Sequence, residues 1–198
     1  MATLLSSGYN NSVYTLETGE YNSPVEGQWV VKVFEDDDFF GPNLEKEYQA
    51  LIQMGSINSL MVKVWDLTSH PSKKEELLIM ERLVPVQPRA IDKKTRLEFL
   101  KKFLDELKEL HAQGWTHADI KRPSHCCDSD SDKWDNVIPT MEGIRLIDAG
   151  CAVSQEDPCF PNEVNKDLAD FCEFAKWFMK DVISEKDMIP FLREWLNI

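Results

Sequence analysis

Three polar residues between positions 117 and 150 have the types and spacing that metal-assisted phosphoryl transfer needs. Asp119 follows a helical pattern, Asn136 stands directly before a short apolar strand, and Asp148 follows the next strand. Side chains at such helix and strand ends can converge on one point. Two carboxylates and an amide that meet there could hold Mg²⁺ and orient a hydroxyl group.

The same stretch resembles the catalytic half of a protein kinase. The run from His117 to Lys121 resembles the kinase catalytic loop, and the Asp-Ala-Gly run at 148–150 resembles the metal-binding D-F-G motif with its Phe replaced. The resemblance implies that Asp119 orients the acceptor hydroxyl, that Lys121 neutralises charge on the transferred γ-phosphoryl group, and that Asp148 holds Mg²⁺. We expect His117 to brace the loop by packing.

The metal-binding Asn departs from the kinase pattern. The family places it five residues after the catalytic Asp, where this chain has Ser124. However, the run DNVIP…GIRLIDAG is similar to the family's Asn-strand-turn-strand-Asp run, with Asn136 12 residues before Asp148. We therefore interpret Asn136 as the metal ligand and residues 122–134, roughly, as an insertion in the catalytic loop. Ser124 as the equivalent, with the metal amide lost, is the rival alignment.

The first 35 residues carry three patterns typical of β-strands, separated by polar segments: Leu4–Ser7, Val13–Glu17 and Trp29–Phe34. The turn between the first two lines up with the kinase Gly-rich loop. Gly8 and Val13 keep that pattern, and the resemblance assigns both to ATP binding.

Lys32 lies among apolar residues of the third predicted strand, in a run that resembles the V-A-I-K of kinases. A partly buried ammonium group there needs an anion, which nucleotide phosphate or a carboxylate could supply. Residues 44–54 are predicted to form a helix, and Glu47, 15 residues after Lys32, occupies the ion-pair position of the family. Glu45 is the alternative partner.

Two further strands are predicted at 60–65 and 77–80, followed by a segment that resembles the hinge between kinase lobes. The resemblance implies that Met80 stands against the adenine. It also implies that the backbone carbonyl of Glu81 and the backbone amide of Leu83 bind the adenine edge. Backbone recognition leaves no side-chain pattern, so these assignments rest on position.

The C-terminal half is predicted to be mainly helical. Apolar residues at three- and four-residue steps predict helices over 92–113 and 163–183, and a last helix spans 188–196. The resemblance implies that Asp167, on the second of these helices, accepts backbone amides of the catalytic loop. The segment after Gly150 is short, and the later helices of typical kinases are lacking.

These elements together predict a single α+β domain with a bilobal, protein-kinase-like fold. Residues 1–83 would form an N-lobe of five antiparallel strands and one helix together with the hinge, and residues 84–198 a truncated, mainly helical C-lobe. Because the peptide-docking platform is missing, the chain resembles small atypical kinases of the RIO and KEOPS types.

Composition narrows the expected partners. The net charge is −13, from 22 Lys and Arg against 35 Asp and Glu, so neither nucleic acid nor an anionic membrane is expected as a partner. The five Cys are odd in number and show no C-x-x-C spacing, which favours reduced thiols in the cytoplasm. No apolar run approaches the roughly 20 residues of a membrane-spanning helix.

The sequence thus favours an ATP- and Mg²⁺-dependent phosphotransferase that moves the γ-phosphoryl group to a hydroxyl acceptor, for which Ser or Thr of a protein is expected. The competing hypothesis is a catalytically inactive pseudokinase, or a kinase-mimicking module that acts through a protein partner. The degenerate Gly-rich loop, the interrupted catalytic loop and the short C-lobe all favour that alternative.

Overall fold

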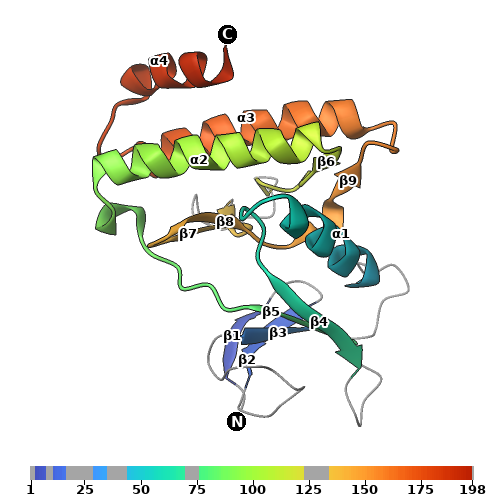
Figure 1. Ribbon diagram of the computed structural model, residues 1–198. Coiled ribbons are helices and arrows are strands. Elements are labelled where there is room, and N and C mark those ends of the chain that lie inside the picture. The colour runs from blue at the N-terminus through green and yellow to red at the C-terminus, as the bar shows by residue number, and fades with distance from the viewer. Residues whose placement is uncertain are drawn as a thin grey trace.

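The computed structural model describes residues 3–7, 11–16, 29–34, 44–69, 76–122 and 134–197. Within these ranges the chain is an α+β protein with one five-stranded antiparallel sheet and four α-helices, which confirms the α+β class predicted from the sequence. The sheet lies at one end of the molecule and the long helices α2 (Lys93–Ala112) and α3 (Phe160–Met179) at the other (Figure 1). Gly8, Ser124 and most of the predicted insertion lie outside the described residues.

The sheet has the strand order β1-β2-β3-β5-β4, and all neighbouring strands are antiparallel. Its strands are β1 (Leu4–Ser7), β2 (Asn11–Thr15), β3 (Trp29–Phe34), β4 (Val64–Ser69) and β5 (Glu76–Glu81). Side chains alternate between the two faces of a strand. On β3, Val31 packs in a small cluster on one face, whereas Val30 joins the main core on the other. Lys32 shares the face of Val30 and therefore points toward the interior of the molecule.

The predicted strand over 60–65 is wrong in its bounds, because β4 begins only at Val64. Leu60, Met61 and Val62 are each at most 1% exposed, so they are buried on all sides and do not alternate as a half-buried strand would. This segment instead hydrogen-bonds to Leu146: the Leu146 amide donates to the Leu60 carbonyl at 2.8 Å, and the Val62 amide to the Leu146 carbonyl at 2.9 Å.

Helix α1 (Leu44–Ile57) continues three residues beyond the predicted end at 54. The N-terminus of α2 is capped by Asp92, whose carboxylate accepts the amides of Lys94 and Thr95. Helix α3 begins at Phe160, three residues before the predicted start at 163, and ends at Met179, four residues before the predicted end at 183. The last helix, α4 (Glu185–Leu196), begins three residues before the predicted start at 188, and Ser184 caps its N-terminus.

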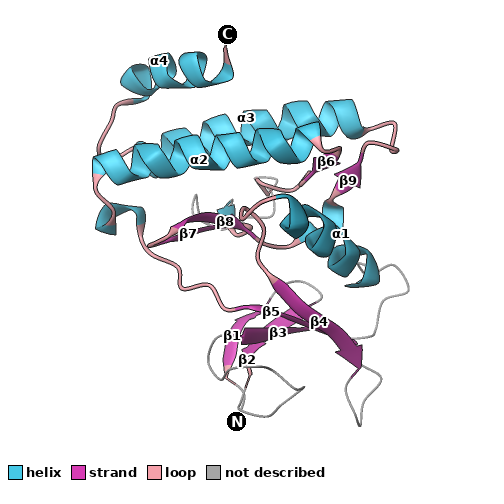
Figure 2. Cartoon of the chain, viewed as in Figure 1, coloured by secondary structure: helices cyan, strands magenta, loops and turns pink. Residues whose placement is uncertain are grey.

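Two short pairs of strands connect the helices to the sheet. Strands β7 (Val137–Thr140) and β8 (Gly143–Leu146) form a hairpin at the two predicted strand positions. The pairing of β6 (Trp115–Thr116) with β9 (Val153–Ser154) was not predicted, because two-residue strands carry no periodic pattern. A 3-10 turn, η5 (Ala149–Cys151), follows β8 and lies against α1. Figure 2 shows the hairpin below the two long helices.

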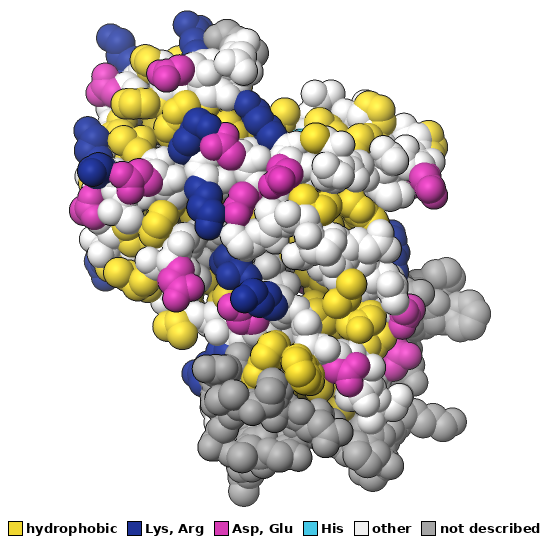
Figure 3. Space-filling view, in the orientation of Figure 1, with side chains coloured by type: hydrophobic (Ala, Val, Ile, Leu, Met, Phe, Trp, Pro, Cys, Tyr) yellow, Lys and Arg dark blue, Asp and Glu magenta, His cyan; other side chains and the backbone are white. Residues whose placement is uncertain are grey.

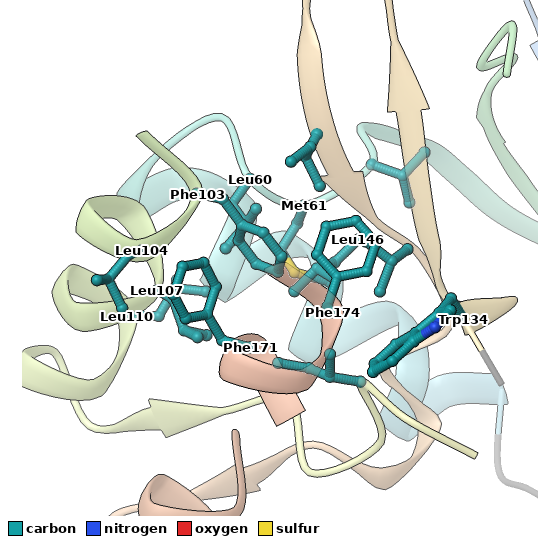
Figure 4. Close-up of a cluster of buried hydrophobic side chains, with 14 of the residues drawn as sticks. Leu60, Met61, Phe103, Leu104, Leu107, Leu110, Trp134, Leu146, Phe171 and Phe174 are labelled. Carbon is teal, nitrogen blue, oxygen red and sulfur yellow. The ribbon is translucent and has the colours of Figure 1, made fainter. Parts of the chain in front are cut away.

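An aromatic core joins α2, α3 and Trp134, which lies three residues before β7. Phe103 on α2 meets Phe171 and Phe174 on α3 edge to face, with ring centroids 5.4 and 5.8 Å apart (Figure 4). Trp134 packs against Phe174 at 5.4 Å from the other side. Such edge-to-face pairs add about 0.5–1.5 kcal/mol each beyond the burial of their surface. The core thus fixes α3 against α2 and Trp134.

A buried arginine ties the start of α2 to the end of α3. Arg96 is 1% exposed; its Nε donates to the Ile91 carbonyl at 2.8 Å and its Nη1 to the Phe178 carbonyl at 2.9 Å. The guanidinium also pairs with Asp181 through both terminal nitrogens. Because all these acceptors lie at helix ends, Arg96 fixes how the two helices pack.

The face shown in Figure 3 carries Lys and Arg side chains intermingled with Asp and Glu over the helical part, with no large region of one sign. Among the described residues, no helix is both long and apolar enough to cross a membrane. Cys151, Cys159 and Cys172 are free thiols.

Candidate functional site

An open cavity of about 570 Å³ lies between the sheet and the β7–β8 hairpin. From the sheet it is lined by Val13, Lys32 and Met80, three of the residues predicted to contact ATP. Its volume is in the range of small-molecule sites. Asn136 and Asp148, the two predicted metal ligands, line it from the opposite side.

Lys32 is held between two carboxylates. Its Nζ lies 2.9 and 2.8 Å from the two carboxylate oxygens of Glu47, and 3.2 Å from Oδ1 of Asp148. Lys32 is 4% exposed and Glu47 1%, so this pair is almost fully removed from water. Burial raises the pKa of the Glu47 carboxyl, and the attraction of Lys32 opposes that rise. The contact predicted from the spacing of 15 residues is therefore present.

Glu45, the alternative partner, is not near Lys32. Its side chain is exposed and accepts a hydrogen bond from Gln49 one turn later at 2.8 Å. The helical period explains why Glu47 and not Glu45 pairs with Lys32. Glu47 lies on the buried stripe of α1 with Leu44, Leu51 and Met54, whereas Glu45 does not.

Asp148 adopts a left-handed backbone conformation, with φ 61° and ψ 70°. Aspartate tolerates this region better than most residues, although it is still uncommon. The turn directs the chain away from β8 into η5 and leaves the Asp148 side chain 33% exposed at the cavity. The backbone is fixed just before this point, because the Ile147 amide donates to the Asn136 carbonyl at 3.0 Å.

Asn136 joins the cavity to Asp119. Its Nδ2 donates to the Asp119 backbone carbonyl at 2.8 Å and to Oδ2 of the Asp119 carboxylate at 3.0 Å. Because Nδ2 makes both bonds, Oδ1 is the atom of this amide that could ligate a cation. Burial raises the pKa of the Asp119 carboxyl; His117 has the opposite effect, and Asp148 adds to the rise.

Asp167 supports the loop that carries Asp119. It is fully buried on α3; its Oδ2 accepts the amide of His117 at 2.8 Å and its Oδ1 the amide of Ala118 at 2.9 Å. These are the backbone contacts predicted for this carboxylate. Ala118 has a φ of 62°, so the two bonds stabilise a backbone conformation that alanine rarely adopts.

His117 braces the loop, as predicted. It is fully buried, and its Nε2 donates to the carbonyl of Ile147 at 2.9 Å. Its Nδ1 accepts the amide of Asp119 at 3.3 Å. Since Ile147 directly precedes Asp148, the imidazole links the backbone beside Asp119 to the backbone beside Asp148.

Some residues predicted for the site lie elsewhere. Neither Lys121 nor Asp119 is among the described residues that line the cavity: Lys121 pairs with Glu173 on α3, and Asp119 is hydrogen-bonded to the lining residue Asn136. The side chain of Glu81 binds Arg145 at 2.8 Å, and Leu83 packs against the main core. The adenine contacts proposed for Glu81 and Leu83 involve their backbone atoms, so these side-chain positions leave that prediction untested.

Sequence reasoning missed other residues that line the cavity. Arg122 lines it and lies 3.3 Å from the carboxylate of Asp135, and Trp134 and Trp177 add aromatic surface. Arg122 and Trp134 are the first and last residues of the predicted insertion, and Trp177 falls on an apolar helix stripe, so no separate sequence signal pointed to any of them. The connection at 85–88 completes the wall.

The oxygen ligands suit Mg²⁺ only if other groups complete its coordination. Within the described ranges, no group of three or more His, Cys, Asp or Glu residues is arranged to hold a metal ion. Asp148 and Asn136 offer one carboxylate and one amide. Mg²⁺ is commonly bound through one or two protein ligands together with substrate phosphates and water, and the two residues fit that mode.

Neither a protein-family model nor a curated protein sequence matches this chain.

Proposed function

We propose that the chain is an ATP- and Mg²⁺-dependent phosphotransferase with a bilobal, protein-kinase-like fold. The observation that carries the proposal is the link from Glu47 through Lys32 to Asp148 across one cavity, with Asn136 connecting that cavity to Asp119. An ammonium group, a carboxylate and an amide oxygen beside one cavity supply the charges that a Mg²⁺–nucleotide complex needs.

Each polar residue has a separate role in this proposal. Lys32, oriented by Glu47, would bind the α- and β-phosphates, because its ammonium group is the cation beside Asp148. Asp148 and Asn136 would hold Mg²⁺, which neutralises charge on the phosphates when bound. Asp119 would orient the acceptor hydroxyl and take its proton as the bond to the γ-phosphorus forms and the bond to the ADP oxygen breaks.

The raised pKa of Asp119 suits this task, since burial increases the affinity of its carboxylate for a proton. The segment after Asp148 is short and tied down: the Gln155 amide donates to the Gly114 carbonyl at 2.8 Å, and β9 pairs with β6. This supports a site that needs no separate ordering step. We propose a hydroxyl acceptor, with Ser or Thr of a protein as the expected class.

The alternative is a non-catalytic module that uses the same fold to bind a protein partner. One observation favours it: Lys121 pairs with Glu173, so the cation expected beside the γ-phosphoryl group is turned toward α3. An active enzyme would have to break this pair in its substrate complex. Because Glu173 is 54% exposed, that exchange costs little.

A thermal-shift titration tests the proposal. The purified protein is titrated with ATP, with and without Mg²⁺, alongside Asp148→Asn and the matched surface control Asp66→Asn. We expect Mg²⁺-dependent stabilisation, about 2.7 kcal/mol at 100 times the Kd, in the wild type and the control but not in Asp148→Asn. If ATP stabilises the protein under none of these conditions, the nucleotide site is excluded.

Transfer itself is tested with γ-labelled ATP and a generic protein acceptor such as casein. Asp119→Asn should abolish transfer and keep the ATP-dependent thermal shift, because Asp119 does not line the cavity. Unchanged turnover in Asp119→Asn would refute its role. A thermal shift without any turnover in the wild type would select the binding module.

A further inference from the structure

Lys166 on α3 contacts the loop that carries Asp119. Its Nζ donates to the carbonyl of Ala118 at 2.6 Å and lies 3.3 Å from Oδ2 of Asp170. Nothing in the kinase resemblance assigns a role to this position. The contact also differs in kind from the pairs on the surface of α2, because the acceptor is a backbone group of the loop itself.

Consecutive residues of α3 bind both polar groups of Ala118. Asp167 accepts its amide at 2.9 Å, and Lys166 donates to its carbonyl at 2.6 Å. With φ at 62°, Ala118 is held in the left-handed region by partners on both sides. The carbonyl of Ala118 shares a peptide group with the amide of Asp119, so Lys166 sets the plane from which the Asp119 side chain projects.

The partners of Lys166 favour this single arrangement. Asp170 is one turn further along α3, and its side chain is only 13% exposed, so it fixes the ammonium group near the loop. Lys121, the lysine expected to work beside Asp119, is bound to Glu173. Lys166 is thus the lysine of α3 that contacts the loop directly.

We propose that Lys166 is a positioning residue for Asp119, which it orients through its hydrogen bond to the Ala118 carbonyl. Its effect on transfer rests on the proposed function, whereas its effect on the loop does not. The two are therefore measured separately.

The first measurement is amide hydrogen exchange on Lys166→Met, Lys166→Arg and a control. The control Lys176→Met changes another lysine of α3 and removes its ion pair with Glu185 at the start of α4. In Lys166→Met we expect exchange at 117–119 to accelerate at least tenfold, with the amides of α3 unchanged. Lys166→Arg keeps a donor for the carbonyl and should stay close to wild type. Equal protection in all variants, or acceleration throughout α3, would overturn the proposal.

The second measurement compares turnover with nucleotide binding. A loop displaced by about 1 Å can cost on the order of 100-fold in rate. We expect Lys166→Met to lose at least tenfold in kcat with its ATP affinity unchanged, and Lys166→Arg to recover most of the loss. An unchanged kcat in Lys166→Met, or a loss of ATP affinity that accounts for the whole defect, would contradict the proposal.

The two measurements separate the possible failures. Accelerated exchange at 117–119 in a protein without turnover would support the role of Lys166 and refute the phosphotransferase. Turnover in the wild type, with no effect of Lys166→Met on kcat or on exchange, would support the phosphotransferase and refute the role of Lys166. If Lys166→Met does not fold, Lys166→Gln replaces it, since Gln stays polar but is too short to make the same bond, and the same outcomes decide.

Discussion

Removing the ammonium group of Lys32 should make the stability of the protein depend strongly on pH. In Lys32→Met, Glu47 stays 1% exposed but loses its cation, and Asp148 loses the same partner. Breaking a buried ion pair by removing one partner typically costs about 3–5 kcal/mol. A domain of this kind has about 5–15 kcal/mol of stability, so the variant should still fold.

The direction of the pH dependence follows from the pKa of Glu47. Burial raises this pKa above its ordinary value of 4.5 in the folded protein, and Lys32→Met removes the attraction that opposes the rise. Between pH 4.5 and the raised value, the folded state binds the proton more tightly than the unfolded state. Stability is therefore lost as the pH rises through that window, by up to about 1.4 kcal/mol per pH unit.

Urea unfolding followed by tryptophan fluorescence, at several pH values between 5 and 8, measures the effect. We expect the deficit of Lys32→Met to be smallest at pH 5 and to grow toward pH 8. The control Lys94→Met breaks an exposed pair with Glu98 and should cost less than about 1 kcal/mol at every pH. The double variant Lys32→Met/Glu47→Leu removes the buried charge and should exceed Lys32→Met in stability at pH 8. A deficit that does not change with pH, or no gain in the double variant, would refute the reasoning.

Three further predictions concern the supports of the site. Arg96→Met should lower the free energy of unfolding by about 3 kcal/mol in urea titrations, because it leaves two buried carbonyls without their donor. Asp167→Asn should cost about 2–4 kcal/mol by the same measurement, since an amide cannot accept both loop amides as the carboxylate does. Gly114→Ala should cost at least about 1 kcal/mol, because Gly114 has φ +83° and an added Cβ would lie 2.8 Å from the Gln155 side chain. Gly55→Ala, in open space on α1, should stabilise by about 0.5–1 kcal/mol, and equal effects at the two glycines would contradict the backbone argument.

The contact between Lys32 and Glu47 was predicted from the kinase resemblance, and regular periods explain why it forms. Lys32 points inward because strand residues alternate, and Glu47 faces it because it falls on the buried stripe of α1. The position of Asn136 directly before β7 likewise brings its amide to Asp119. In each case a strand or helix of known geometry carries the side chain, so spacing along the chain translates into a position in space.

Contacts made by long side chains could not be predicted in this way. The ammonium group of Lys121 reaches Glu173, and that of Lys166 reaches the Ala118 carbonyl, because four rotatable bonds let the tertiary structure choose the partner. The start of β4 was missed for a related reason. The apolar run at 60–62 is equally compatible with a strand and with a buried connection, and only its partner Leu146 decides between them.

The small side chain of Ala149 has a structural consequence for the position of α1. Ala149 is fully buried in η5, which lies directly against α1, the helix that carries Glu47. A small side chain at this contact lets the helix approach closely, and the buried Lys32–Glu47 pair then holds it there. Swinging α1 outward would expose this core contact and separate Lys32 from its buried carboxylate partner Glu47, which is energetically costly. The buried Ala149 and the Lys32–Glu47 pair therefore both favour the packed position of α1 that this structure shows.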